Sequence, residues 1–254
     1  MRVDEFVVRQ GHIYFLLLLL ATTSGCSLHW SASWMQAENT KVRVVEANET
    51  GLDSLFIPYR KFLDSAMQIP VGMLGERLEK KGINGSLGFF ITDAMLTIAR
   101  QSVQHPVDGC VMNAGGIRLP ELPAGLISTG KLYELLPFDN QLTLVELRGI
   151  EFRDFLRHSL SSGGWPISGI DLQAEDSSRL YIQIAGKALV DTQVYQIVVP
   201  DYLANGGDRC SMLENKPRRS LNILLRDAVI QYWGSQPTQS PLFLQDPKIR
   251  IRQP

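Results

Sequence analysis

This chain of 254 residues contains few histidines and cysteines, and it has almost no net charge. Four histidines and three cysteines leave little material for a metal-rich site. Lys and Arg total 25 against 26 Asp and Glu, so the net charge of −1 lacks the basic surplus that binding to nucleic-acid phosphates requires. We therefore expect no nucleic-acid partner, and no metal or other cofactor held by this chain.

Low-complexity runs are also missing, and the composition is that of a folded protein. Charged residues make up 20% and hydrophobic residues 44%, which excludes a disordered chain. The length fits one large domain or two small ones. No Gly-x-Ser-x-Gly elbow and no Walker-type loop occurs, so the motifs of serine hydrolases and of P-loop ATPases are absent.

The hydrophobic run near the N-terminus, at 13–21, is too short to span a membrane, because a transmembrane helix needs about 20 apolar residues. It has the length of a signal-peptide core. Small residues and then Cys26 follow it, which is typical of bacterial lipoproteins. We predict a lipoprotein-type signal peptide over 1–26, lipid on Cys26 and a tether over 27–40. Ser27, directly after this cysteine, favours sorting of the lipoprotein to the outer membrane, where it would face the periplasm. Ordinary cleaved secretion and an uncleaved anchor are the alternatives.

Two cysteines remain after the predicted lipid-bearing one. Cys110 and Cys210 would lie in an oxidising compartment, which permits a disulfide. The sequence cannot show whether their Cα atoms approach closely enough. The favoured interpretation is that both are small buried hydrophobic residues.

Helical and alternating hydrophobic patterns are interspersed along the rest of the chain, over 41–254. This interspersion predicts one domain of the α/β or α+β class. Helices are predicted over 54–67, 86–103, 149–160 and 221–233. Strands are predicted over 41–47, 107–112, 141–147, 181–184 and 194–199, with a loop over 201–208.

Three loop segments combine small residues with polar or aromatic ones. The segment 113–118 reads Asn-Ala-Gly-Gly-Ile-Arg; its glycines let a backbone approach a ligand, and its arginine can bind phosphate or carboxylate. The segment 137–140 sets a phenylalanine beside Asp and Asn. The segment 201–208 places Tyr202 and Asp208 on a glycine-rich loop, which suits a planar ring and sugar hydroxyls. Each segment alone also fits an ordinary turn.

Together, the order and spacing of these segments resemble the C-terminal domain of the 5'-nucleotidase family, which includes bacterial UDP-sugar hydrolases and animal ecto-5'-nucleotidases. The resemblance extends from about Leu74 to Ile251. It implies a four-layer α/β/β/α sandwich with mixed sheets and a nucleotide cleft on one surface. It is carried by SLGFFITDAM at 86–95, NAGGIR at 113–118, LLPFDN at 135–140, VELRG at 145–149 and YLANGGD at 202–208.

The resemblance also implies a role for each matching residue. Phe138 and Tyr202 correspond to the two aromatic residues that sandwich the nucleobase. Asn113 and Arg118 correspond to residues that contact the nucleotide, with Arg118 nearest the phosphate. Gly115, Gly116, Asn140 and Asp208 complete the implied substrate site: the glycines permit close approach, Asn140 bonds the base and Asp208 accepts bonds from ribose hydroxyls.

Some positions depart from the family's pattern. A second family arginine has no arginine counterpart here, and Lys81 falls near its place. A lysine ammonium is a point charge and cannot form the paired hydrogen bonds of a guanidinium. Phe89 replaces a family asparagine, and Arg209 with Cys210 replaces a glycine-aromatic pair. We expect these changes to lie near the cleft and to alter specificity.

Family members hydrolyse phosphate esters with two metal ions in a separate N-terminal domain. Only about 47 residues separate Cys26 from Leu74, and no Asp-x-His or Asn-His pair occurs, so we expect that domain to be missing here. The first hypothesis is a nucleotide-recognition subunit that acts with a separate metallophosphatase on a nucleoside 5'-monophosphate or related nucleotide. The alternatives are a non-catalytic periplasmic nucleotide-binding lipoprotein and a scaffold that keeps only the fold.

Overall fold

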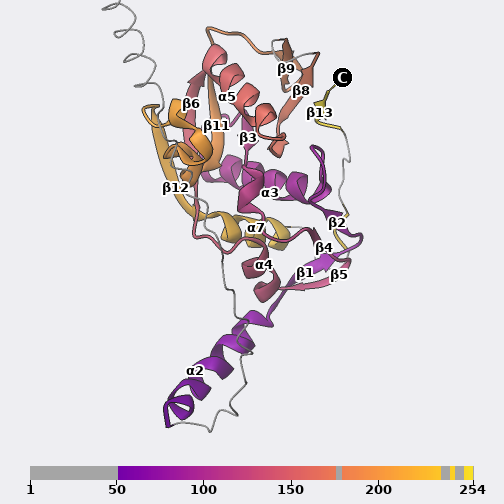
Figure 1. Ribbon diagram of the computed structural model, residues 1–254, viewed down its shortest axis with the longest axis vertical. Helices are drawn as coiled ribbons and strands as arrows, with labels where there is room; N and C mark the ends of the chain where they lie inside the picture. The colour runs from indigo at the N-terminus through magenta and orange to yellow at the C-terminus, as the bar shows by residue number, and fades with distance from the viewer. Residues whose placement is uncertain (1–50, 176–178, 236–240, 244–248, 254) are drawn as a thin grey trace, which may run out of the picture. The chain divides into compact units, whose positions relative to one another are not determined.

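The structure is a computed structural model that describes residues 51–175, 179–235, 241–243 and 249–253. The predicted signal peptide, Cys26, the tether and the predicted strand over 41–47 lie outside these residues. The described chain is a mixed α/β domain, as its interspersed patterns predict (Figure 1). Within the described ranges, no helix has both the length and the apolar character that crossing a bilayer requires.

A five-stranded mixed sheet forms the centre of the domain, with the strand order β12-β6-β11-β3-β7. The long strands β6 and β11 pair antiparallel, while β11 and β3 run parallel. The central strands are buried on both faces, as expected for a sheet covered on both sides. The strands are β3 (Gly109–Val111), β6 (Gln141–Arg148), β7 (Ile167–Ser168), β11 (Val194–Pro200) and β12 (Arg218–Leu224).

Two helices cover one face of this sheet, α3 (Ser86–Ser102) and α7 (Leu225–Gly234). They lie side by side in Figure 1 and contact each other directly. The ring of Phe90 on α3 packs edge-on against Trp233 of α7, with the ring centroids 5.2 Å apart. Apolar residues on almost every turn of α3 are buried, so this helix is the centre of the first hydrophobic core.

The other face of the sheet packs against α5 (Gly149–Ser161) and a four-stranded sheet in the order β10-β9-β8-β13. Burial alternates along β9, so its inward residues contribute to this second core while the residues between them face solvent. At the start of α5, the Glu151 carboxylate accepts a hydrogen bond of 2.8 Å from the Arg148 backbone N–H. The strands are β8 (Ile170–Ala174), β9 (Leu180–Ile184), β10 (Lys187–Ala188) and β13 (Ile251–Arg252).

Smaller elements connect these layers. Two-stranded sheets join β1 to β5 and β2 to β4, both antiparallel. The remaining elements are β1 (Pro70–Leu74), β2 (Leu78–Glu79), β4 (Glu121–Leu122), β5 (Gly125–Ser128), α4 (Thr129–Leu135), α6 (Asp201–Ala204) and the 3-10 turns η1 (Ala114–Gly116), η2 (Gly207–Arg209) and η3 (Ser211–Leu213).

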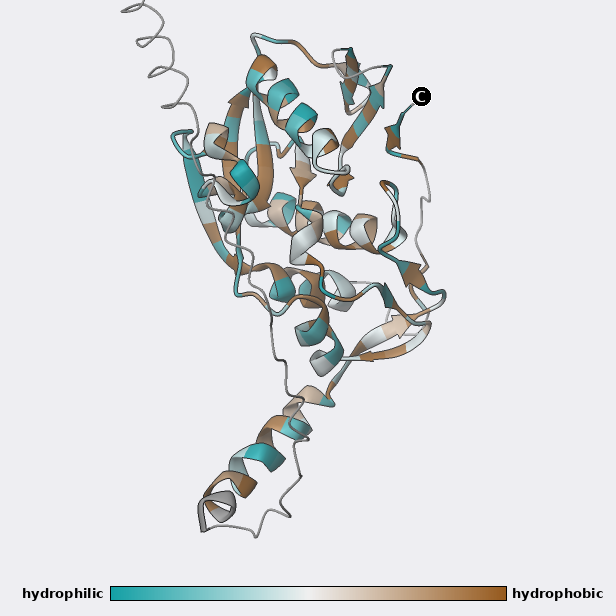
Figure 2. Ribbon diagram, in the orientation of Figure 1, coloured by the Kyte–Doolittle hydropathy of each residue, from teal (hydrophilic) through white to brown (hydrophobic). Residues whose placement is uncertain are grey.

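The first described helix, α2 (Gly51–Met67), confirms the helix predicted over 54–67. Apolar and polar residues alternate along its ribbon, as the brown and teal bands in Figure 2 show. The large apolar side chains from Leu55 to Leu63 are nevertheless exposed. Just beyond the helix, the Ile69 carbonyl accepts a hydrogen bond of 2.9 Å from the backbone N–H of Thr129, which opens α4.

Two of the predicted elements are corrected by the structure. The segment 221–233 is not one helix: β12 continues to Leu224 and α7 begins only at Leu225. β12 pairs with β6, which lies far away in the sequence, on both sides of an irregularity: Ser220 lies opposite Thr143 and Leu224 opposite Gln141. The predicted loop over 201–208 contains the short helix α6, in which the Asn205 backbone N–H donates to the Asp201 carbonyl over 2.9 Å.

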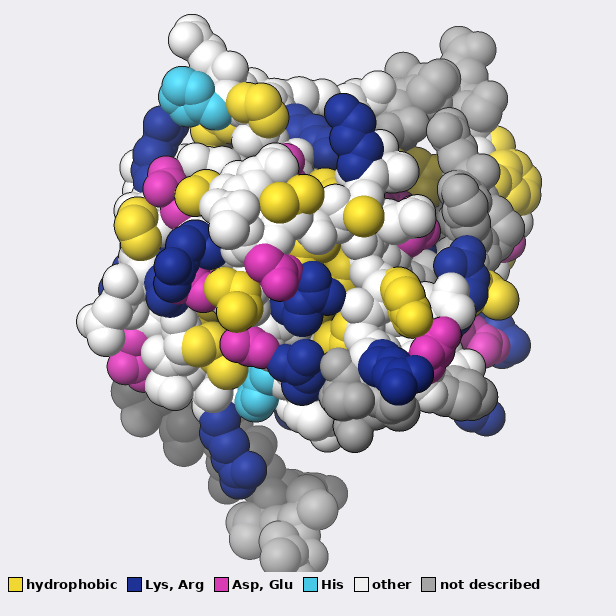
Figure 3. All heavy atoms as spheres, turned by 90° about the horizontal axis from the view of Figure 1, so that it is seen from above, with side chains coloured by type: hydrophobic (Ala, Val, Ile, Leu, Met, Phe, Trp, Pro, Cys, Tyr) yellow, Lys and Arg dark blue, Asp and Glu magenta, His cyan; other side chains and the backbone are white. Residues whose placement is uncertain are grey.

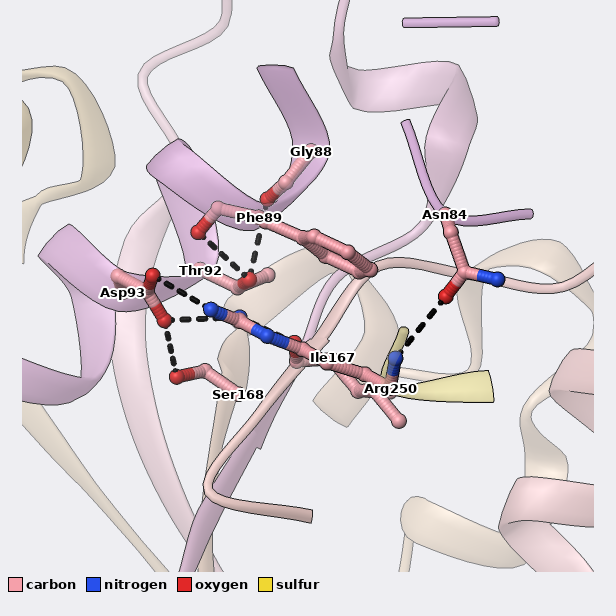
Figure 4. A network of polar contacts seen from close by, with 8 residues as sticks. All are labelled: Asn84, Gly88, Phe89, Thr92, Asp93, Ile167, Ser168 and Arg250. Atoms are coloured by element: carbon pink, nitrogen blue, oxygen red, sulfur yellow. Dashed lines mark hydrogen bonds and ion pairs between the residues drawn. The ribbon is translucent and has the colours of Figure 1, made fainter. Parts of the chain in front are cut away.

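An ion pair ties the C-terminal segment to α3. The Arg250 guanidinium donates to both carboxylate oxygens of Asp93, at 2.8 and 2.7 Å. Figure 4 shows the guanidinium lying along the Phe89 ring, 4.3 Å from its centroid, with Ser168 also bonded to Asp93. Phe89 is therefore a buried packing residue beneath Arg250. The expected effect of this substitution on specificity stays a prediction.

Candidate functional site

Three loop segments that lie far apart in the sequence meet around one cavity of about 330 Å³. One follows β3, one follows α4 and one follows β11, so the central sheet and the helix before β6 position all three. The cavity is lined by Asn113, Gly115, Gly116, Arg118, Phe138, Asn140, Tyr202 and Asp208. These are eight of the nine predicted substrate-binding residues; their binding role itself stays a prediction.

The segment after β3 forms the 3-10 turn η1. A Cβ at Gly116 would come within 2.8 Å of the Met112 methyl group, so a side chain there would require this methionine to shift. Gly115 has room and is exposed to the cavity. Asn113 precedes the turn and is 4% exposed. The turn therefore brings backbone and one buried amide to the cavity wall.

A backbone hydrogen bond joins the first two segments. The Arg118 N–H donates to the Leu135 carbonyl over 2.9 Å. This bond brings the Arg118 guanidinium to 5.9 Å from the centroid of the Phe138 ring. A cation at that distance is within the range of a cation–π interaction, so Arg118 and Phe138 form one side of the cavity together.

Arg226 on α7 fixes the turn that carries Phe138, and sequence reasoning missed this residue. It is 3% exposed; it donates to the Leu136 carbonyl over 2.9 Å and to the Asp139 carboxylate over 2.8 Å. Its guanidinium also lies over the Tyr133 ring, 3.7 Å from the centroid. A lone arginine within a predicted helix gave no signal of this role, because its partners lie about 90 residues away.

The third segment holds Tyr202 and Asp208 in a fixed relation. The Tyr202 hydroxyl donates to one carboxylate oxygen of Asp208 at 3.0 Å and accepts the Asp208 backbone N–H at 3.2 Å. The tyrosine ring lies directly against Gly207, where a Cβ would clash with it. The sequence comparison with the family predicts only a ring at this position, so the hydroxyl bonds are a finding of the structure.

Asp208 also connects the third segment to the first. Its second carboxylate oxygen accepts a 2.6 Å hydrogen bond from the Asn113 amide, and its carbonyl lies 2.8 Å from Nε2 of His158. Asp208 has a φ of 51° and Arg209 a φ of 65°, a left-handed conformation that costs a residue with a side chain about 1–2 kcal/mol. Such strain is maintained only where surrounding contacts impose it.

Two features of the cavity fit a planar polar ligand. Phe138 and Tyr202 are half exposed, which leaves ring surface free for stacking. The Oδ1 atom of Asn113 is buried without a hydrogen-bond partner among the described residues. Because an unsatisfied buried acceptor is costly, this atom would gain from an N–H or O–H donor on a ligand.

Other positions singled out from the sequence lie elsewhere. Lys81 is exposed and does not line the cavity. Its neighbour Lys80 instead donates to the Ile117 carbonyl over 2.7 Å, beside Arg118. This contact joins residues 37 positions apart in the sequence, so the tertiary structure decides that Lys80 reaches the segment.

Cys110 and Cys210 are free and buried, as the favoured interpretation predicts. Burial, and then the negative charge of Asp208, raise the pKa of Cys210 to about 12. Burial also raises the pKa of Cys110 well above its usual range. Both thiols are therefore protonated at neutral pH and are poor nucleophiles. Cys210 does not line the cavity, so its expected effect on specificity is not a direct contact.

No group of three or more His, Cys, Asp or Glu side chains is arranged to hold a metal ion among the residues that the structure describes. On the face seen in Figure 3, basic and acidic side chains are intermingled, without a large region of one sign. The cavity itself offers ring surface for stacking and an unpaired buried acceptor for hydrogen bonding.

Comparisons with known proteins agree with this picture. The family model for the C-terminal domain of 5'-nucleotidases matches residues 68–215. Protein UshA of Escherichia coli is 26% identical over 221 residues, which cover 84% of this chain and 39% of UshA. The 5'-nucleotidase of Rattus norvegicus is 28% identical over 159 residues, or 52% of this chain and 27% of that protein. This chain thus spans well under half the length of these relatives.

Solved structures share the fold. The 5'-nucleotidase precursor of Thermus thermophilus superposes with a TM-score of 0.65 at 24% identity, covering 79% of this chain and 42% of that chain. The NAD nucleotidase of Haemophilus influenzae gives a TM-score of 0.63 at 17% identity, covering 80% of this chain and 41% of that chain. These likenesses confirm the predicted fold class, with its mixed sheets and helices.

Proposed function

The chain belongs to the family of 5'-nucleotidase C-terminal domains, and on that premise we propose that it recognises a nucleoside 5'-monophosphate or a related nucleotide. The base would stack between Phe138 and Tyr202, with Arg118 near the phosphate and Asp208 near the ribose. The observation that carries the proposal is the meeting of eight predicted residues at one cavity with two half-exposed rings.

In this proposal the protein acts in extracytoplasmic nucleotide catabolism with a separate metallophosphatase. The metal ions for phosphate ester hydrolysis would come from that partner, because the described residues offer no metal cluster. A lipid on Cys26 would hold the protein at the outer membrane, facing the periplasm. Fractionation of cells expressing Cys26→Ala tests the anchor: the variant should leave the membrane fraction, and continued membrane association would contradict it.

Binding calorimetry with AMP, adenosine and UDP-glucose tests the recognition site. Stacking contributes about 1–3 kcal/mol per base, so a dissociation constant in the micromolar to millimolar range is expected. Phe138→Ala combined with Tyr202→Ala should abolish binding. Tyr181→Ala removes a comparably exposed ring on β9 and should leave binding unchanged.

Three results would argue against this function. Failure of all three ligands to bind at millimolar concentration would mean that the cavity does not recognise nucleotides by itself. Binding that survives loss of both rings would place the ligand elsewhere. Release of phosphate from AMP by the purified protein alone would contradict the requirement for a catalytic partner.

A further inference from the structure

A second cavity of about 640 Å³ adjoins the first. The two share Gly115 and Asp208, which form the wall between them. The second cavity continues from this wall to the end of α5 and is also lined by His158, Ser162 and Arg209. A ligand that reaches Asp208 from the first cavity therefore stands at the entrance to the second.

The wall between the cavities is held in place by hydrogen bonds. Both carboxylate oxygens of Asp208 accept bonds, from the Tyr202 hydroxyl at 3.0 Å and from the Asn113 amide at 2.6 Å. His158 holds the Asp208 carbonyl from the other side, with Nε2 at 2.8 Å. The acid is thus partly neutralised by donors, which reduces its repulsion of a nearby anion.

Arg209 is the unusual residue of the second cavity. Its φ of 65° is a conformation that glycine adopts without strain, yet the chain has an exposed arginine there. In the described part of the chain, its guanidinium has no ion-pair or hydrogen-bond partner. An unpaired guanidinium beside the Ser162 hydroxyl supplies charged and neutral donors that suit a phosphate group.

We infer that the second cavity is a subsite for a phosphate on the ribose 2'- or 3'-side of a nucleotide, with Arg209 as its main contact. This inference rests on the proposed function, which places the base between Phe138 and Tyr202. A carboxylate in that cleft is a natural acceptor for ribose hydroxyls, as at other nucleotide sites. A phosphate on the hydroxyl edge would then pass Asp208 and enter the second cavity.

Calorimetry with AMP, adenosine 3',5'-bisphosphate and adenosine 2',5'-bisphosphate tests the subsite. At least one bisphosphate should bind about tenfold more tightly than AMP, as expected for one charge-assisted contact. Arg209→Gln should reduce this ratio to about one, and Arg209→Lys should retain part of it. Arg219→Gln, which removes an exposed arginine from β12, should leave the ratio unchanged.

The outcomes separate the two proposals. If AMP binds and neither bisphosphate binds more tightly, the subsite is refuted while nucleotide recognition stands. A gain that persists in Arg209→Gln, with folding verified by circular dichroism, would refute the role of Arg209 and with it the inference. If no nucleotide binds, both the proposed function and the subsite fail.

Discussion

The helices α2 and α3 each have 17 residues and each show apolar residues at helical spacing, yet they occupy opposite environments. On α2, Phe62 is 73% exposed; on α3, Phe90 is 2% exposed. Helical periodicity predicts which side of a helix is apolar, and it does so correctly for both. It carries no information about which surface covers that side.

The difference comes from the partners of each helix. α3 packs against α7 and against strands of the central sheet, so its apolar side chains are enclosed. α2 contacts α4, and its larger apolar side chains are exposed in the described chain. The same local pattern should therefore contribute very different amounts to the free energy of unfolding.

The largest effect is expected from Phe90, the buried member of the pair formed by Phe90 on α3 and Phe62 on α2. Phe90→Ala removes a ring that packs against Trp233 and should lower the free energy of unfolding by about 3–5 kcal/mol. Urea unfolding followed by circular dichroism measures this change. A loss below about 1 kcal/mol would show that α3 is not the centre of the first core.

The next largest effect is expected from the ion pair between Asp93 on α3 and Arg250. Asp93→Ala leaves the Arg250 guanidinium, which is 12% exposed, without its carboxylate and should cost about 3 kcal/mol. The double variant Asp93→Leu with Arg250→Met removes both charges and should restore much of that loss in the same urea titration. If the double variant is no more stable than Asp93→Ala, the unpaired charge is not the cause.

An acid titration extends the comparison of α2 and α3 to α5. Hydrogen bonds to the charged Glu151 carboxylate stabilise the start of this helix. Hydrogen bonds from Lys216, and then from Arg148, lower the pKa of Glu151 from 4.5 to about 2. Its stabilising contribution is complete above pH 4.5 and is lost as the pH falls towards 2. Glu151→Gln should therefore cost about 1 kcal/mol at pH 6 and less at pH 3. A pH-independent difference between variant and parent would rule out this linkage.

The smallest effect is expected from the exposed member of the pair. Phe62→Ala should change the free energy of unfolding by no more than about 0.5 kcal/mol, because exposed substitutions remove few contacts. The urea titration used for Phe90→Ala provides the direct comparison. A loss comparable to that of Phe90→Ala would mean that the apolar side of α2 is covered in the folded protein.

Much of the fold could be predicted because its signals are local. The helices α2, α3 and α5 and the strands β3, β6, β9 and β11 lie where the apolar patterns predict them. The helix predicted over 221–233 begins only at Leu225, because the residues before it belong to β12, which pairs with β6 at Ser220 and Leu224, a contact that periodicity does not detect. Local pattern and long-range pairing conflicted there, and the pairing decided the outcome.

The candidate site shows the same division. Eight of its residues could be named because three loop segments keep the order and spacing of a family. Lys81 does not line the cavity, and only the packed structure shows that its neighbour Lys80 bonds to the Ile117 carbonyl. The surroundings of Phe89 are a further example, since only the packed structure shows its buried ring against the Arg250 guanidinium.

The sequence by itself determined the fold class, the turn residues and the kind of side chain that the cavity presents, because these depend on spacing and local backbone preference. Tertiary structure alone decided that Arg226 fixes the turn of Phe138, that the Tyr202 hydroxyl holds Asp208, and that Arg209 faces a second cavity. Each of these contacts joins a residue to a partner or cavity whose position the packed fold sets, and no periodicity or motif encodes such an approach.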